Sequence, residues 1–120
     1  MTIQKFTQLN TWKEAHLLVI LTYWLTDKFP SKELFILVSQ MRRCAVSITS
    51  NIAEGFTRQG KKEKIQFYFM AKASLTELEN QIIISKDLKY ISGGEFQKTI
   101  EKTELVGRLL TGLIKSVKSL

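Results

Sequence analysis

The sequence predicts an all-α fold, a single antiparallel four-helix bundle with up-down-up-down topology. Its 120 residues contain one proline and six glycines, too few for a fold rich in loops and turns. No segment alternates apolar and polar residues with the period of two that marks a β-strand. Four segments instead carry apolar residues at helical spacing, and their short connections favour antiparallel neighbours. We expect one domain over residues 1–120.

The first helix is predicted over residues 12–28. Thr11 and Glu14 have the spacing of a capping box at its start, and Pro30 follows its end. No Asp, Glu, Lys or Arg lies between Glu14 and Asp27, and the apolar residues of this segment point to every side of the helix. A helix at the edge of a four-helix bundle leaves one side uncovered, so we expect another subunit to cover it.

The second helix is predicted over residues 32–54, with Ser31 as its N-cap and Gly55 as its C-terminal signal. Its apolar positions cover roughly 200° of the circumference, about twice a normal core stripe. This excess again predicts a homo-oligomer. The apolar positions are Leu34, Phe35, Leu37, Val38, Met41, Cys44, Ala45, Val46, Ile48, Ile52 and Ala53.

The third helix is predicted over residues 61–90, after a turn at Gly60. Ser92 and Glu95 supply a second capping box, and the fourth helix follows over residues 95–118. In both helices the predicted core positions recur at spacings of three and four residues. They are Phe67, Ala71, Leu75, Leu78 and Ile82 in the third helix, and Phe96, Ile100, Leu110, Ile114 and Val117 in the fourth.

A polar stripe lies on the second helix, opposite its apolar side. On a helical wheel four residues fall within roughly 80° of Arg43, namely Ser47, Asn51, Glu54 and Arg58. Three interpretations stay open: a solvated helix face, a hydrogen-bonded seam against the third helix, and a surface that contacts phosphate groups. Short hydroxyl and amide side chains favour the seam, because a plain surface would carry Lys and Glu instead. The seam would comprise Ser47, Asn51, Glu54, Ser74 and Glu77.

The net charge of +7, from 18 basic and 11 acidic residues, favours an anionic partner. Residues 58–64 hold a surplus of three positive charges, and Arg108, Lys115 and Lys118 add three more near the C-terminus. Either cluster could equally be a solvated helix end that aids solubility. If nucleic acid binds, we expect contacts to phosphates without base reading. The candidate residues are Arg42, Arg43, Arg58, Lys61, Lys62 and Lys64.

Catalytic, metal and cofactor sites are not predicted. The chain has one histidine, His16, and one cysteine, Cys44, so neither a nucleophile–base pair nor a zinc site can be assembled. No glycine-rich phosphate loop is present. The longest uncharged run, residues 17–26, is too short to span a bilayer, and no signal peptide is visible. We therefore expect a cytoplasmic protein that is not an enzyme.

A set of residues resembles the four-helix-bundle proteins encoded by intervening sequences in bacterial 23S rRNA genes. The resemblance covers residues 9–91, is most specific over residues 40–55, and extends to accessory proteins of diversity-generating retroelements. The residues that carry it outside that segment are Trp12, Ala15, Tyr23, Thr26, Phe29, Pro30, Glu33, Arg58, Phe67, Ala71, Ser74, Leu75, Glu77, Leu78, Glu79 and Gln81.

The resemblance implies a non-enzymatic bundle that assembles into a basic, barrel-like homopentamer. The retroelement relatives are thought to bind nucleic acid and a reverse transcriptase. Two functions follow as expectations. The first is an oligomeric protein that binds RNA or DNA through phosphate contacts. The alternative is a scaffold that docks a partner enzyme such as a reverse transcriptase, with nucleic-acid binding incidental.

Overall fold

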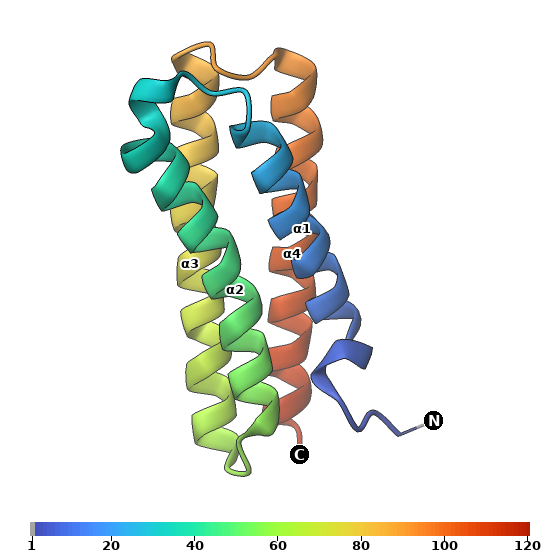
Figure 1. Ribbon diagram of the computed structural model, residues 1–120. Coiled ribbons are helices and arrows are strands. Elements are labelled where there is room, and N and C mark those ends of the chain that lie inside the picture. The colour runs from blue at the N-terminus through green and yellow to red at the C-terminus, as the bar shows by residue number, and fades with distance from the viewer. Residues whose placement is uncertain (1) are drawn as a thin grey trace.

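The computed structural model describes residues 2–120 and has four long α-helices that run antiparallel around one core (Figure 1). α1 packs against α2 and α4, and α3 closes the bundle by packing against the same two helices. Both ends of the chain lie at the lower end of Figure 1. The predicted all-α bundle is confirmed, with no strand among the described residues. The helices are α1 (Asn10–Thr26), α2 (Ser39–Thr57), α3 (Lys61–Asp87) and α4 (Gly93–Lys118).

The core is a continuous cluster of aliphatic side chains contributed by all four helices. Seven of the ten predicted core positions of the last two helices are buried, and Phe67, Phe96 and Ile100 are half-buried. Phe67 is an exception, because its neighbour Tyr68 takes the inward position and Phe67 lies under the guanidinium of Arg58. The largest fully buried side chains are Tyr68, Leu18, Leu25, Met41, Ile48, Ile52, Leu78, Ile82 and Leu110.

The start of α1 differs from the prediction. The helix begins at Asn10, its N-cap is Leu9, and no side chain caps it. Thr11 is buried inside the first turn, and Glu14 accepts a hydrogen bond from Lys102 Nζ at 2.7 Å. The predicted capping box at Thr11 is therefore wrong, because Thr11 is buried in the core and the Glu14 carboxylate is bonded to Lys102 of α4.

The segment before α2 is not the regular helix predicted from residue 32. A 3-10 turn, η2 (Ser31–Glu33), leads into a π-helical turn, η3 (Leu34–Val38), and α2 starts only at Ser39. Tyr90 Oη donates a 2.7 Å hydrogen bond to Glu33 and so holds the start of this corner. Because a π turn takes up an extra residue, it shifts the faces of the segment. As a result Phe35 is 89% exposed, whereas Val38 is buried.

Gly55 does not end α2, which continues to Thr57. The glycine is buried where α2 packs directly against Phe67 and Tyr68 of α3. A Cβ atom on Gly55 would lie 2.6 Å from Tyr68 Cε1. Its role is therefore close packing, which a helix-stop interpretation missed.

The end of α3 and the start of α4 use backbone and side-chain caps. Lys89 has a left-handed backbone with φ of 66°, and Tyr90 N donates to Ser85 O at 2.9 Å. This is the pattern of a Schellman motif, which ends α3 at Asp87 rather than at the predicted residue 90. The predicted capping box at Ser92 is confirmed, since Ser92 Oγ accepts from Glu95 N and the Glu95 carboxylate accepts from Ser92 N.

Candidate nucleic-acid interface

The polar stripe of α2 makes one direct bridge to α3. Ser47 Oγ and Ser74 Oγ lie 2.8 Å apart. Asn51 Nδ2 donates to Ser47 O at 2.9 Å and to Ser47 Oγ at 3.1 Å. Because Ser47 Oγ accepts from Asn51, its own proton is available for Ser74. These three side chains form a half-buried hydrogen-bonded chain between the helices.

The other two predicted seam residues lie elsewhere. Glu77 accepts a hydrogen bond from Cys44 Sγ at 3.4 Å, on the apolar side of α2. Burial, together with this bond to Glu77, raises the pKa of the Cys44 thiol. Glu54 is exposed and accepts from Arg58 at 2.8 Å within its own helix. Glu77 thus links α3 to α2 through Cys44 and not through the Ser47–Ser74 bridge, whereas Glu54 makes no bond to α3.

Arg42 links α2 to the end of α1. Its Nε donates to Thr26 Oγ1 at 2.9 Å, and a terminal nitrogen donates to Asp27 Oδ1 at 3.0 Å. The guanidinium also lies 4.6 Å from the centre of the Tyr23 ring. Asp27 offsets the charge of Arg42, so this arginine is better suited to holding two helices together than to binding phosphate.

Arg43 is exposed, and within residues 2–120 it forms no ion pair. It borders a shallow hollow of about 510 Å³ that is lined largely by apolar residues, among them Tyr23, Phe35 and Val46. Arg43 is fifteen residues before Arg58, which is about 22 Å along a helix. The predicted basic residues therefore occupy two separate places.

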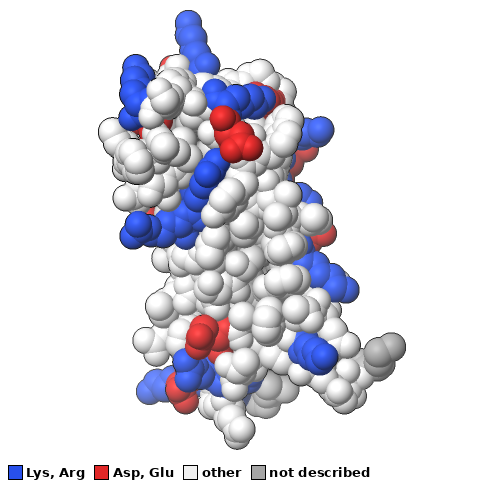
Figure 2. All heavy atoms as spheres, viewed as in Figure 1, with Lys and Arg blue, Asp and Glu red and all other residues white. Residues whose placement is uncertain are grey.

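Four of the six predicted residues gather at the α2–α3 turn. They are Arg58, Lys61, Lys62 and Lys64. The last turns of α4 end at the same place, because Lys61 Nζ donates to Leu120 O at 2.6 Å. This contact brings Lys115 and Lys118 to the same end of the bundle. Figure 2 shows basic side chains at the lower end, with acidic ones beside them.

The cations at this end differ in how far their donors are already hydrogen-bonded within the protein. We define the basic end as Arg58, Lys61, Lys62, Lys64, Lys115 and Lys118. Lys64 Nζ donates to Phe56 O at 2.7 Å and Gly55 O at 3.3 Å, and so caps the C-terminal carbonyls of α2. Burial lowers the pKa of Lys64. Arg58 stacks 4.7 Å above the ring of Phe67, and its buried Nε has no partner among the described residues. Lys62 and Lys115 are exposed and form no side-chain hydrogen bond in the described chain.

Two aromatic side chains beneath these cations were not recognised from the sequence. Phe67 supports Arg58, and Lys118 Nζ lies 5.7 Å from the ring centre of the exposed Phe69. Both phenylalanines follow the basic run 58–64 on α3, and that proximity was the available signal. A cation over a ring face keeps its charge at the surface while its stem is packed.

In residues 2–120, no group of three or more His, Cys, Asp or Glu side chains lies close enough together to hold a metal ion. No helix of this region is both long enough and apolar enough to cross a membrane.

The four-helix fold can be compared with that of known protein families. Residues 7–112 match the family model described as 23S rRNA-intervening sequence protein. The chain belongs to this family. Membership in the 23S rRNA-intervening sequence protein family confirms the resemblance carried by residues 40–55, while the relation to retroelement accessory proteins stays a prediction. No curated protein matches the chain.

A solved structure shares the fold of this member of the 23S rRNA-intervening sequence protein family. It is described as a protein with unknown function from the S23 ribosomal protein family, from Bacteroides thetaiotaomicron. The two chains are 18% identical and superimpose with a TM-score of 0.79, over 88% of this chain and 95% of the other. At this identity the likeness establishes the fold alone.

Proposed function

We propose that the protein is a non-enzymatic, self-associating bundle that binds RNA or DNA through phosphate contacts at its basic end. One observation carries the proposal: the α2–α3 turn and the end of α4, far apart in sequence, bring six cations together. Within the described residues 54–64 and 108–120, the acidic side chains are Glu54 and Glu63. The family's 23S rRNA context supports RNA as the first nucleic acid to test.

The chemistry of the basic end supports phosphate contact rather than base reading. Lys62, Lys115 and Lys118 have ammonium groups free of ion pairs in the described chain. Each ammonium that neutralises a phosphate releases a counterion, so affinity should fall steeply with salt. Lys64 and Arg42 act differently, because their donors already hold backbone carbonyls and Asp27.

Self-association would strengthen the binding of nucleic acid by the basic end. The proposed assembly is a homopentamer, as the resemblance to the intervening-sequence proteins suggests. Five copies would present five basic ends, and simultaneous contacts raise avidity without any new residue. The proposed location is the cytoplasm, where the lone thiol of Cys44 would stay reduced.

The test compares binding of RNA and duplex DNA at about 50 mM and about 200 mM salt. Lys62→Glu at the basic end is paired with Lys32→Glu at the opposite end; both lysines are exposed, and the charge change is the same. We expect Lys62→Glu alone to weaken binding and to reduce its salt dependence. Equal loss in both variants would point to net charge only, and no binding at low salt would refute the proposal.

The alternative is a scaffold that docks a partner enzyme such as a reverse transcriptase. One observation favours it: the face formed by α1 and α2 carries few charges between the upper and lower ends of the molecule (Figure 2). Charge depletion is typical of the centre of a protein–protein interface. Absence of nucleic-acid binding, with self-association intact, would favour this alternative.

A further inference from the structure

Two apolar surfaces have no part in phosphate binding. The first is the outer side of α1, where Leu17, Ile20 and Trp24 are exposed and Trp24 is 58% exposed. Their spacing of three and four residues places them on one face, turned away from the core residues Leu18 and Leu25. An exposed apolar stripe of this kind marks an interaction surface.

The second surface is the corner before α2, where Leu34, Phe35 and Ile36 are consecutive and all exposed. Phe35 projects furthest, since 89% of it is exposed. The corner is held in place on both sides, by the hydrogen bond from Tyr90 to Glu33 and by the buried Val38. The backbone of the corner is therefore held in place, and the Phe35 side chain projects from it.

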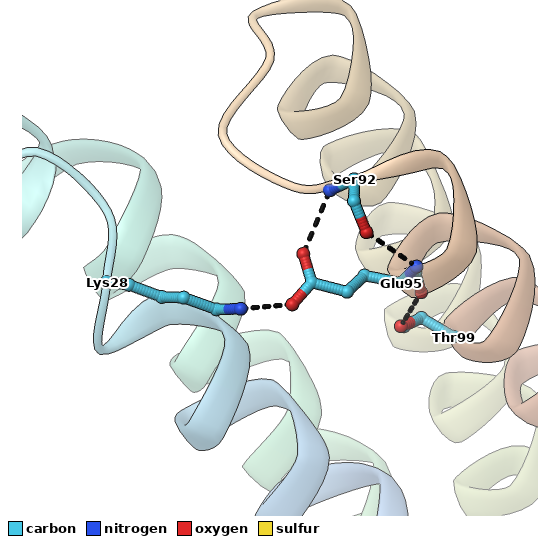
Figure 3. Close-up of polar contacts among 4 residues, drawn as sticks. All are labelled: Lys28, Ser92, Glu95 and Thr99. Carbon is cyan, nitrogen blue, oxygen red and sulfur yellow. Dashed lines mark hydrogen bonds and ion pairs between the residues drawn. The ribbon is translucent and has the colours of Figure 1, made fainter.

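A hollow that could receive such a projection lies between α1 and α4. Its volume is about 410 Å³, and it is lined by Leu21, Trp24, Leu25, Gly94, Glu95, Lys98 and Thr99. Lys28 crosses from the end of α1 to Glu95, which is also bonded to Ser92, and this ion pair fixes the two walls relative to each other (Figure 3). Lys28 also lies 4.5 Å from the ring centre of Trp24.

The projection and the hollow lie on opposite sides of α1. Phe35 and Tyr23 line a different hollow, the shallow one beside Arg43 on the α2 side of α1. The α1–α4 hollow is on the other side, next to Trp24 and Thr99. Neither surface can therefore satisfy the other within one molecule.

We propose that Phe35 of one copy inserts into the α1–α4 hollow of the next copy. The occupant is a second copy because one chain carries both halves of the contact, whereas an unrelated partner would leave one half exposed. The space suffices, since a cavity of about 150 Å³ already accommodates benzene. A contact between two different patches is heterologous, so it repeats from copy to copy and closes into a ring when the rotation allows.

The exposed apolar area also supports contacts between copies. Eight large apolar side chains of α1, the corner and α2 are 41–89% exposed. At roughly 200 Å² for a large side chain, they present on the order of 800 Å², divided between the projecting and the receiving face. One contact between copies therefore buries on the order of 800 Å² in total, at the low end for a specific interface, and each copy in a ring makes two such contacts. They are Leu17, Ile20, Tyr23, Trp24, Leu34, Phe35, Ile36 and Val46.

The experiment is light scattering on two variants, alone and mixed. Phe35→Asp removes the projection. Gly94→Trp fills the hollow, and its added Cβ meets nothing nearer than Ser92 Oγ at 4.0 Å, so the fold should be kept. We expect each variant to be monomeric and their mixture to form a dimer, because one intact projection then meets one intact hollow. Phe69→Asp is the matched control, since Phe69 is exposed on α3 and should leave the assembly unchanged.

This inference rests on the proposed self-association, and the outcomes separate the two. A monomeric unaltered protein overturns self-association itself. An oligomeric protein whose size is unchanged by Phe35→Asp overturns only the insertion of Phe35. Monomeric variants that stay monomeric when mixed overturn the heterologous arrangement, and dissociation by Phe69→Asp places the interface on another face. Circular dichroism of each variant shows whether the helices are retained.

Discussion

Replacing Gly55 with alanine tests how closely α2 and α3 approach. The added Cβ would lie 2.6 Å from Tyr68 Cε1, 2.9 Å from Tyr68 Cδ1 and 3.1 Å from Phe67 Cβ. Carbon atoms in contact prefer about 3.5–4.0 Å, so the ring or the helix must move by close to an ångström. The Tyr68 ring is 1% exposed and packs against Ile114 and Val117 of α4. It therefore has no free direction in which to move.

The magnitude follows from two opposing effects. Forcing an extra carbon into a tight core costs about 1–3 kcal/mol. Alanine in a helix gains about 0.5–1 kcal/mol over glycine. We expect Gly55→Ala to lower the free energy of unfolding by about 1–2 kcal/mol, or the melting temperature by roughly 4–8 °C.

The assay is urea unfolding followed by circular dichroism, at one protein concentration because self-association would shift the apparent stability. Gly112→Ala is the matched control. Gly112 is an exposed residue within α4, and an added Cβ meets nothing within 4 Å. It should raise stability by about 0.5–1 kcal/mol. If Gly55→Ala were as stabilising as Gly112→Ala, the reasoning about close approach would be refuted.

Three further predictions concern caps and bridges. Lys89→Gly should raise the free energy of unfolding by about 0.5–1 kcal/mol, since glycine adopts the left-handed backbone without a Cβ penalty; no gain in thermal unfolding would contradict this. Lys28 lowers the pKa of Glu95 below its ordinary 4.5, so the Glu95 carboxylate stabilises the fold above that pH and loses this effect as the pH falls. The stability advantage over Glu95→Gln should therefore shrink between about pH 5 and pH 3, and a constant difference would be inconsistent with the ion pair. A double-mutant cycle of Ser47→Ala and Ser74→Ala should give a coupling of about 0.5–1.5 kcal/mol, whereas additive losses would argue against the bridge.

Local signals predicted most of the fold. The Ser92 capping box is predicted from the sequence and present in the structure, because both partners lie within one turn. Lys28 bonds to the other oxygen of the Glu95 carboxylate and leaves the cap intact. Thr11 and Glu14 have the same spacing, yet Lys102 from α4 takes the Glu14 carboxylate. The two motifs are alike in sequence and differ only in their tertiary neighbours.

The candidate site could be predicted in composition but not in arrangement. The polar stripe and the basic run were visible as patterns on a wheel and along the chain. The sequence did not show which of these basic residues are already bonded within the protein. Asp27 neutralises Arg42, and the carbonyls of Gly55 and Phe56 accept hydrogen bonds from Lys64. Such assignments depend on side-chain reach between helices, which a one-dimensional pattern does not contain.

The sequence by itself determined four helices, their order and the unusual breadth of apolar surface on the first two. These properties depend on periodicity and turn residues, which act within a few positions along the chain. The tertiary structure alone decided that Gly55 is a packing residue, that α4 completes the basic end, and that Phe35 projects from a π-helical corner opposite the hollow beside Trp24. Each of these results from contacts between segments far apart in the chain, where interhelical distance and not residue type selects the role.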